Sequence, residues 1–136
     1  LAENGVETLF YKVKQKPGKP LLAGIKEDKL IFALPGNPAS VLTCFMQYVK
    51  PSIAQWMGNP AAWEQAIPYP LATNWEKQAK LTVFLKARLV AGQVEVLPGQ
   101  ESFNLLSFGS ADGLVEVGEQ LLEVEAGTAL PFYPWS

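Results

Sequence analysis

The sequence contains no histidine and a single cysteine, Cys44, among its 136 residues. Zinc sites of the usual type need several histidine or cysteine ligands, and the Ser-His-Asp and Cys-His catalytic arrangements need an imidazole, so the chain by itself can build none of them. One cysteine also excludes an internal disulfide bond. The neighbours Thr43, Phe45 and Met46 predict that Cys44 is a packed thiol on a helix, in a reducing compartment.

Strong charge and long apolar runs are also missing. The net charge is −2 and the isoelectric point is about 5.1, so the overall charge does not favour nucleic acid as a partner. No apolar stretch is long enough to cross a bilayer and no signal peptide is visible, so we expect a cytoplasmic protein with no membrane partner. A composition of 49% hydrophobic and 18% charged residues is that of a globular chain with one core or two small ones.

The clearest motif is an apolar run at residues 30–34 followed at once by Pro35, Gly36, Asn37 and Pro38. The run predicts a strand buried on both faces of a parallel sheet. Asn37 is a good N-cap and Pro38 a good first helical residue, because the N–H that proline lacks would have no partner there. The sequence therefore predicts a strand that turns abruptly into a helix.

The predicted helix carries apolar residues at spacings of three and four, which places them on one stripe facing a core. The stripe consists of Val41, Leu42, Phe45, Val49, Ile53 and Trp56. Pro51 should bend or split the helix, because its ring removes one backbone hydrogen bond. Gly58 should end the helix in the left-handed conformation.

Four lysines, Lys12, Lys14, Lys16 and Lys19, lie within eight positions shortly before this motif. If residues 9–14 form a strand, Lys12 and Lys14 share one face, while Lys16 and Lys19 enter the next loop. Anions bind at helix N-termini, so lysines close to one predict a site for a phosphate. The alternative is an ordinary strand-to-helix turn beside a solvated, lysine-decorated edge strand.

Prolines cluster after Gly58, and we place a linker at residues 58–63, which predicts two domains, residues 1–58 and 59–136. The second domain contains short alternating runs, among them a hairpin with Gly92 in its turn, which predict a small all-β barrel or sandwich. The proline-containing end of the chain is expected to dock on this unit as an extended segment and not as a central strand.

The stretches FYKVKQKPGKP and LPGNPAS, in this order and spacing, resemble molybdopterin molybdenumtransferase, the MoeA and gephyrin E-domain family. The resemblance implies an α/β fold, a truncated molybdopterin-binding three-layer domain over residues 1–58, followed by the family's C-terminal β domain. It also implies that the chain is a fragment, with the glycine-containing pterin-binding loop and the acidic metal-binding residues upstream.

Enzymes of this family take adenylylated molybdopterin and molybdate and, with a divalent cation such as Mg²⁺, release AMP as molybdenum is inserted. The resemblance implies a homodimer, Mg²⁺ ligands upstream of this chain, and no activity for the fragment alone. No residue here is expected to act as a general acid, a general base or a metal ligand. The residues expected to bind the polyanionic substrate are Lys12, Lys16, Lys19, Pro35, Gly36, Asn37, Pro38, Ser40 and Ser102.

The chain departs from the family pattern in two places. Gln100 and Ser102 match a functional loop of relatives, but Glu101 stands where the family has glycine. Lys86 stands where relatives commonly have arginine, and lysine offers a point charge in place of a bidentate fork. We expect Lys86 and Arg88 to form an exposed basic strand face that balances nearby glutamates.

Two other functions stay open at this point. The protein could be a non-catalytic scaffold that binds molybdopterin, or a domain that binds another phosphorylated small molecule. With about two strands and one long helix, residues 1–58 should expose edge strands and one apolar helix face. We therefore predict association through residues 1–58, with another copy or with the missing part of the domain.

Overall fold

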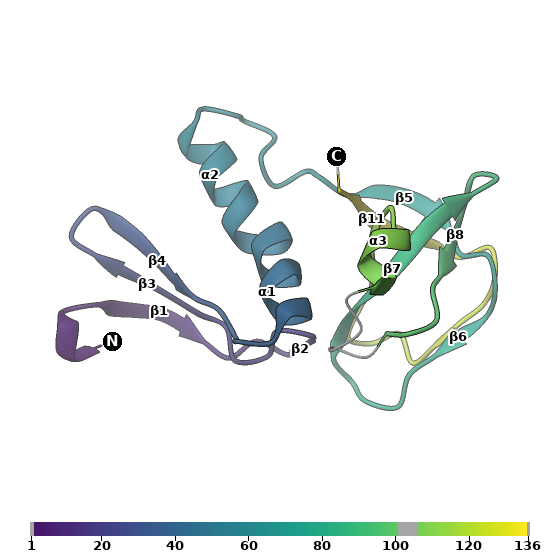
Figure 1. The fold of residues 1–136 in the computed structure, drawn as a ribbon, viewed down its shortest axis with the longest axis horizontal. Coiled ribbons are helices and arrows are strands. Elements are labelled where there is room, and N and C mark those ends of the chain that lie inside the picture. Colours follow the sequence, from purple (N-terminus) through teal and green to yellow (C-terminus); the bar gives the residue numbers. More distant parts are fainter. Residues whose placement is uncertain (1, 101–105, 136) are drawn as a thin grey trace.

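The structure, a computed structural model, describes residues 2–100 and 106–135, which form two lobes (Figure 1). The first lobe begins with a short 3-10 turn and contains a three-stranded sheet and one long helix. Its elements are η1 (Ala2–Asn4), β1 (Glu7–Tyr11), β3 (Leu22–Lys26), β4 (Lys29–Ala33), α1 (Pro38–Cys44), the π-helical η2 (Phe45–Val49) and α2 (Lys50–Trp56).

The sheet of the first lobe is antiparallel, in the order β1-β3-β4. The prediction that residues 30–34 form a fully buried strand of a parallel sheet is therefore wrong: β4 pairs antiparallel with β3, and this run is half-buried. The reason is the two-residue turn between Lys26 and Lys29, in which Glu27 has a φ of 57° and returns the chain alongside β3. Glutamate rarely adopts a positive φ, so Glu27 does not signal this turn in the sequence.

The long helix passes through Pro51 without separating into two helices (Figure 1). Over Phe45–Val49 it widens to π-helical spacing, and the Lys50 N–H donates to the Phe45 carbonyl. The Ser52 hydroxyl donates to the Tyr48 carbonyl at 2.7 Å. Gly58 follows the helix with a φ of 89°, as predicted.

The apolar stripe of this helix is not covered by the part of the chain that the structure describes. Val41, Phe45, Ile53 and Trp56 are 37%, 40%, 46% and 67% exposed, so the prediction that they face a core does not hold within these residues. All five residues of β1 are exposed as well. The lobe therefore has the exposed edge strand and the apolar helix face that were predicted for residues 1–58.

The second lobe is built from strands, with one short helix. Its elements are β5 (Ile67–Pro70), β6 (Trp75–Glu76), β7 (Thr82–Val90), β8 (Gln93–Val96), α3 (Leu106–Ser110), β9 (Gly113–Val117), β10 (Glu123–Val124) and β11 (Ala129–Pro134). The predicted hairpin is present, because Val90 pairs with Gln93 across Ala91 and Gly92, both with positive φ.

None of the helices in residues 2–100 and 106–135 combines the length and apolar character needed to pass through a bilayer.

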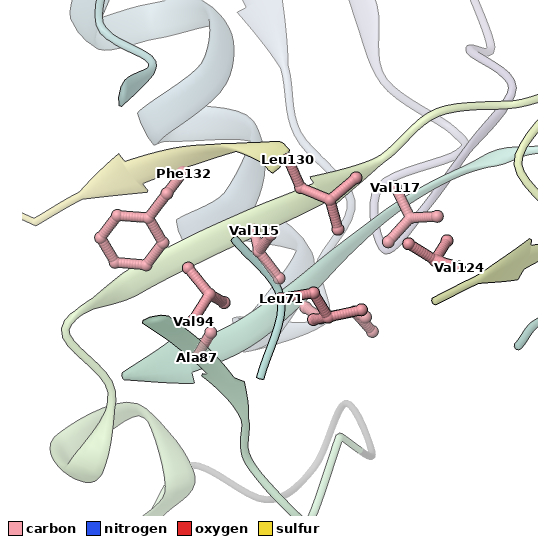
Figure 2. Close-up of a cluster of buried hydrophobic side chains, with 9 residues drawn as sticks. Leu71, Ala87, Val94, Val115, Val117, Val124, Leu130 and Phe132 are labelled. Carbon is pink, nitrogen blue, oxygen red and sulfur yellow. The ribbon is translucent and has the colours of Figure 1, made fainter. Parts of the chain in front are cut away.

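The strands of the second lobe form a sheet with β2 (Gln15–Lys16), in the order β2-β7-β9-β11-β5 with β8 also paired to β7, and a separate β6-β10 pair. The fold is thus an α/β unit followed by an all-β unit of sandwich-like sheets, as predicted; the described strands do not close into a barrel. Figure 2 shows the core of the second lobe. The core consists of Leu71, Leu85, Ala87, Val94, Val115, Val117, Val124, Leu130 and Phe132.

The end of the chain is a central strand, which corrects the expectation of an extended docking segment. Strand β11 pairs with β9 on one side and β5 on the other, and Phe132 is completely buried. Proline is tolerated here because Pro131 lies opposite Pro68 of β5, just before the pairing with β9 begins at Phe132.

One short strand connects the two lobes. Strand β2 (Gln15–Lys16) leaves the first lobe and pairs in parallel with β7, Gln15 opposite Thr82 and Lys16 opposite Val83. The Thr82 N–H also donates to the Lys14 carbonyl at 3.0 Å. Strand β2 therefore adds residues from the N-terminal part of the chain to the sheet of the second lobe. The domain boundary at residues 58–63 stays a prediction.

A Gly113→Ala substitution tests the packing of β9 against β11. A Cβ atom at Gly113 would lie 2.1 Å from the Tyr133 carbonyl oxygen, whereas a Cβ atom at Gly109 would meet no atom within 4 Å. We expect Gly113→Ala to lower the free energy of unfolding by about 1–3 kcal/mol, as overpacking does. Gly109→Ala, the matched control, should not destabilise the protein. Urea unfolding of both variants measures the difference, and equal stability would contradict the close packing.

The exposed helix stripe predicts that the isolated chain associates. Phe45→Ser should weaken self-association seen by sedimentation velocity, because it removes an apolar side chain from the stripe, with little change in stability. Leu121→Ser, which changes an equally exposed residue of the second lobe, is the control. A well-folded monomer of the unmodified chain at high protein concentration would contradict the prediction.

Candidate functional site

The start of the helix confirms Asn37 as its N-cap. The Asn37 Oδ1 accepts from the Ala39 N–H at 3.0 Å and from the Ser40 N–H at 3.4 Å, and the Asn37 carbonyl accepts from the Val41 N–H at 2.9 Å. Pro38 has no N–H to offer. The first amide groups of the helix are therefore taken by Asn37, so a bound anion would depend on side-chain charge more than on backbone N–H groups.

The other residues predicted to shape this turn differ in accessibility. Gly36 and Pro38 are exposed, Pro35 and Asn37 are half-buried, and Ser40 is buried. A Cβ atom at Gly36 would meet nothing within 4 Å, so no atom of the described residues requires glycine there. Open space beside an exposed turn leaves room for a ligand to approach the backbone.

The lysines lie in and beside a closed loop of the first lobe. The Lys12 N–H donates to the Leu21 carbonyl at 2.9 Å and the Val13 N–H to the Lys19 carbonyl at 2.8 Å. Strand β1 ends at Tyr11 and Lys12 has a φ of 65°, so the prediction that Lys12 and Lys14 share a strand face is wrong. The left-handed conformation of Lys12 ends the alternation of side chains along the strand.

The four lysines differ in whether they form an ion pair. Lys14 forms an ion pair with Glu119 of the second lobe, at 2.5 Å. Within residues 2–100 and 106–135, Lys12, Lys16 and Lys19 form no ion pair. The unpaired lysines are the three that were predicted to bind the substrate.

A cavity of about 630 Å³ lies where the two lobes meet. Lys16 and Pro17 from β2 and its loop line it together with Ala39 from the first turn of α1. The second lobe contributes Trp75, Glu76, Lys77, Gln78, Ala79, Leu81, Val83, Phe84, Leu85 and Gln100. The cavity thus brings Lys16 beside the start of the helix, whereas Lys12 and Lys19 are outside its lining.

The cavity follows one edge of β7 between two partner strands. Val83 pairs with β2 and with β9, and Ala87 pairs with β8 and with β9, so β2 and β8 occupy the same edge of β7. Between them, Gln100 acts like a short piece of strand. Its Oε1 accepts from the Lys86 N–H at 3.0 Å, and its Nε2 donates to the Lys86 carbonyl at 2.9 Å.

Lys86 is buried, which corrects the prediction of an exposed basic face. Its side chain is 3% exposed, its Nζ donates to the Gly99 carbonyl at 2.7 Å, and it lies 4.8 Å from the centre of the Phe108 ring. The alternation of β7 correctly places Lys86 and Arg88 on the same face of the strand. At Lys86, however, α3 covers this face and buries the side chain. Arg88, two residues on, is exposed and pairs with Glu95, as predicted.

Lys77 fixes the loop after β6, which lines part of the cavity. Its Nζ donates to the carbonyls of Leu81, Val117 and Gly118, at 2.5 Å and 3.3 Å for the first two. Burial lowers the pKa of Lys77, and the charge of Glu119 opposes this shift. Three carbonyl acceptors use all the donors of the ammonium group, so Lys77 has a structural part in shaping the cavity.

Comparison with known proteins agrees with this architecture. A family model described as the MoeA C-terminal region (domain IV) matches residues 68–135, half of the chain, and a second described as a probable molybdopterin binding domain matches residues 1–55. This chain belongs to the MoeA family.

Several MoeA proteins are similar along nearly the whole chain. A molybdopterin molybdenumtransferase of Synechocystis is 31% identical over 138 residues, which cover 96% of this chain and 32% of the relative. Molybdopterin molybdenumtransferase 2 of Mycobacterium tuberculosis is 33% identical over 130 residues, 94% of this chain and 32% of the relative. A solved MoeA structure from Pyrococcus horikoshii matches 98% of this chain and 33% of its own, with a TM-score of 0.77 and 26% identity. The chain thus spans about a third of these relatives.

Much of the cavity of this MoeA-family chain has no signature in the amino-acid sequence. Trp75 and Lys77 carry no local signal, because they reach the site through the pairing of β6 with β10 and through distant carbonyl groups. Gln100 is expected only as a match to a loop of relatives, and no sequence pattern indicates its contact with β7. Ser102 and Glu101 lie outside the described residues.

Metal ligands are a separate question for a MoeA protein. In the part of the chain that the structure describes, no three or more acidic, cysteine or histidine side chains are grouped so that they could hold a metal ion. The described residues therefore do not fit a Mg²⁺ site. Any Mg²⁺ that serves this cavity would need ligands from elsewhere.

The thiol of Cys44 should be inert at neutral pH. Cys44 is completely buried, and burial raises its pKa to about 11 from an ordinary value near 9. At pH 8 the native protein should therefore react with iodoacetamide about a hundredfold more slowly than the urea-unfolded chain, because the thiolate is the nucleophile. Mass spectrometry of the alkylated peptide measures both rates. Similar rates in the two states would contradict the buried position.

Proposed function

We propose that the protein to which this chain belongs is a molybdopterin molybdenumtransferase, which inserts molybdenum from molybdate into adenylylated molybdopterin and releases AMP. The observation that carries the proposal is the position of Lys16, on the lining of the cavity between the lobes and beside the first turn of α1. Membership of the MoeA family and the names of the relatives support it. This chain supplies binding of the anionic substrate and is inactive alone.

The charge available at the cavity suits a phosphorylated substrate. Lys16 lines the cavity and is free of ion pairs with the described residues, and Lys12 and Lys19 lie in or beside the same closed loop. A cation held in place by a hydrogen-bonded loop stabilises bound phosphate without reorganising. Since Asn37 occupies the amides of the helix start, the lysines provide the attraction and Asn37 fixes the turn beside them.

The remaining features of the proposal come from the family. We propose a cytoplasmic homodimer, with Mg²⁺ held by residues outside this chain. Ser102 would add a hydroxyl to the substrate site, and Ser40 another in the first turn of the helix. No residue of this chain takes the part of a general acid or base in the proposal.

A lysine substitution tests the site directly. In the full-length protein, Lys16→Ala should weaken molybdopterin binding about tenfold, because one charge-assisted contact to phosphate is lost. Asn37→Ala should also weaken binding, by loosening the turn. Lys29→Ala, at the start of β4, is the matched control and should bind as the unmodified protein does. Isothermal titration gives the affinities, and unchanged binding in both site variants would remove the proposed site.

A second assay separates the enzyme from a binding scaffold. The scaffold function stays an alternative because Lys86 and Glu101 stand where the family resemblance leads us to expect arginine and glycine. Full-length protein supplied with adenylylated molybdopterin, molybdate and Mg²⁺ should release AMP, and Lys16→Ala should raise the KM of this reaction. Binding without any AMP release would leave only the scaffold.

A further inference from the structure

We propose that Tyr48 and Gln15 are positioning residues for Lys16: the hydrogen bond from the Tyr48 hydroxyl to Gln15 holds strand β2 so that Lys16 faces the cavity between the lobes. The inference rests on the proposed function, in which Lys16 binds the anionic substrate. Neither residue lines the cavity, so both act through Lys16.

Gln15 is buried between the loop and the helix. Its Oε1 accepts from the Tyr48 hydroxyl, and its Nε2 donates to the Pro17 carbonyl at 2.9 Å. The side chain is 5% exposed, while the neighbouring Lys16 is exposed. Successive side chains of a strand point to opposite sides, so the contacts that fix Gln15 against the helix also fix the direction of Lys16.

The π-helical turn places Tyr48 for this contact. Tyr48 lies within η2, where the Lys50 N–H donates to Phe45 five residues back, and its own carbonyl accepts from the Ser52 hydroxyl. Such turns rotate the following side chains relative to a regular helix and are frequent at functional sites. Burial raises the pKa of Tyr48, with smaller contributions from Cys44 and Glu116, so its hydroxyl remains a donor at neutral pH.

The loop fits tightly against the same side of the helix. The Cys44 thiol donates to the Gly18 carbonyl at 3.9 Å, and it lies 3.9 Å from the Gln15 Nε2. A Cβ atom at Gly18 would come within 2.5 Å of the Cys44 Sγ and 2.8 Å of the Gln15 Nε2, and Gly18 has a φ of 100°. Glycine at this position therefore lets the loop approach the helix closely enough for the Tyr48 contact.

The test compares Tyr48→Phe with Tyr133→Phe in the full-length protein. Each change removes one half-buried hydroxyl that donates a hydrogen bond, Tyr48 to Gln15 and Tyr133 to Glu116, but only the first contact reaches β2. Hydrogen exchange followed by mass spectrometry should be about fivefold faster in peptides covering residues 12–19 for Tyr48→Phe, the effect of one net hydrogen bond. Tyr133→Phe should leave these peptides unchanged.

Kinetics and binding show whether the pair serves Lys16. We expect Tyr48→Phe to raise the KM for adenylylated molybdopterin and the Kd for molybdopterin about fivefold, with kcat within about twofold. In a Gln15→Met background, Tyr48→Phe should have no further effect, because the two residues act through one contact.

Several outcomes would overturn the proposal. These are unchanged exchange at residues 12–19, equal effects of Tyr48→Phe and Tyr133→Phe, additive effects in the double variant, or faster exchange without weaker binding while Lys16→Ala does weaken it. If neither Tyr48→Phe nor Lys16→Ala alters binding or KM, the proposed function of the site fails. The exchange data then still decide whether Tyr48 holds β2.

Discussion

The pairing of β2 with β7 is the contact on which the site depends. Two residues of the first lobe, Gln15 and Lys16, extend the sheet of the second lobe, and the Lys14 carbonyl accepts from the Thr82 N–H beside them. The ion pair between Lys14 and Glu119 adds a contact between the same two lobes. Without this short strand, Lys16 would have no fixed relation to the cavity formed by the second lobe.

The chemistry of the site follows from which charges are committed and which are not. Three lysines have structural contacts. Lys14 pairs with the Glu119 carboxylate, Lys77 donates to backbone carbonyls, and Lys86 donates to the Gly99 carbonyl beneath α3. Lys16 is exposed on the cavity lining and has no ion pair within the described residues. At the helix start, Asn37 fixes the shape of the turn and accepts from the first N–H groups, so few backbone amides remain for a ligand. In the proposed function, the polyanionic substrate is therefore bound chiefly by lysine side chains.

Local signals predicted the features that depend on a few adjacent residues. The Asn37 cap, the left-handed Gly58 and the hairpin at Gly92 all follow from residue types with strong backbone preferences. The antiparallel pairing of β4 was missed although it is local, because its turn places Glu27, a residue with little preference for positive φ, in the left-handed region. Features set by distant partners were missed as well: the burial of Lys86 and the central place of β11. The cavity is of this second kind, because β2, the helix start and the loop after β6 meet only in the folded chain.

Hydrogen exchange at the Thr82 amide, measured by NMR on the full-length protein, tests the central contact most directly. Thr82 is the first residue of β7. Its N–H donates to the Lys14 carbonyl, which belongs to the other lobe. If β2 holds the lobes together, this amide should be protected well beyond an unstructured chain, and its protection should fall when Gln15 is replaced by methionine. Exchange of the Thr82 amide at the rate of an unprotected amide, while the rest of β7 and β9 remain protected, would contradict the placement of Lys16 at the cavity.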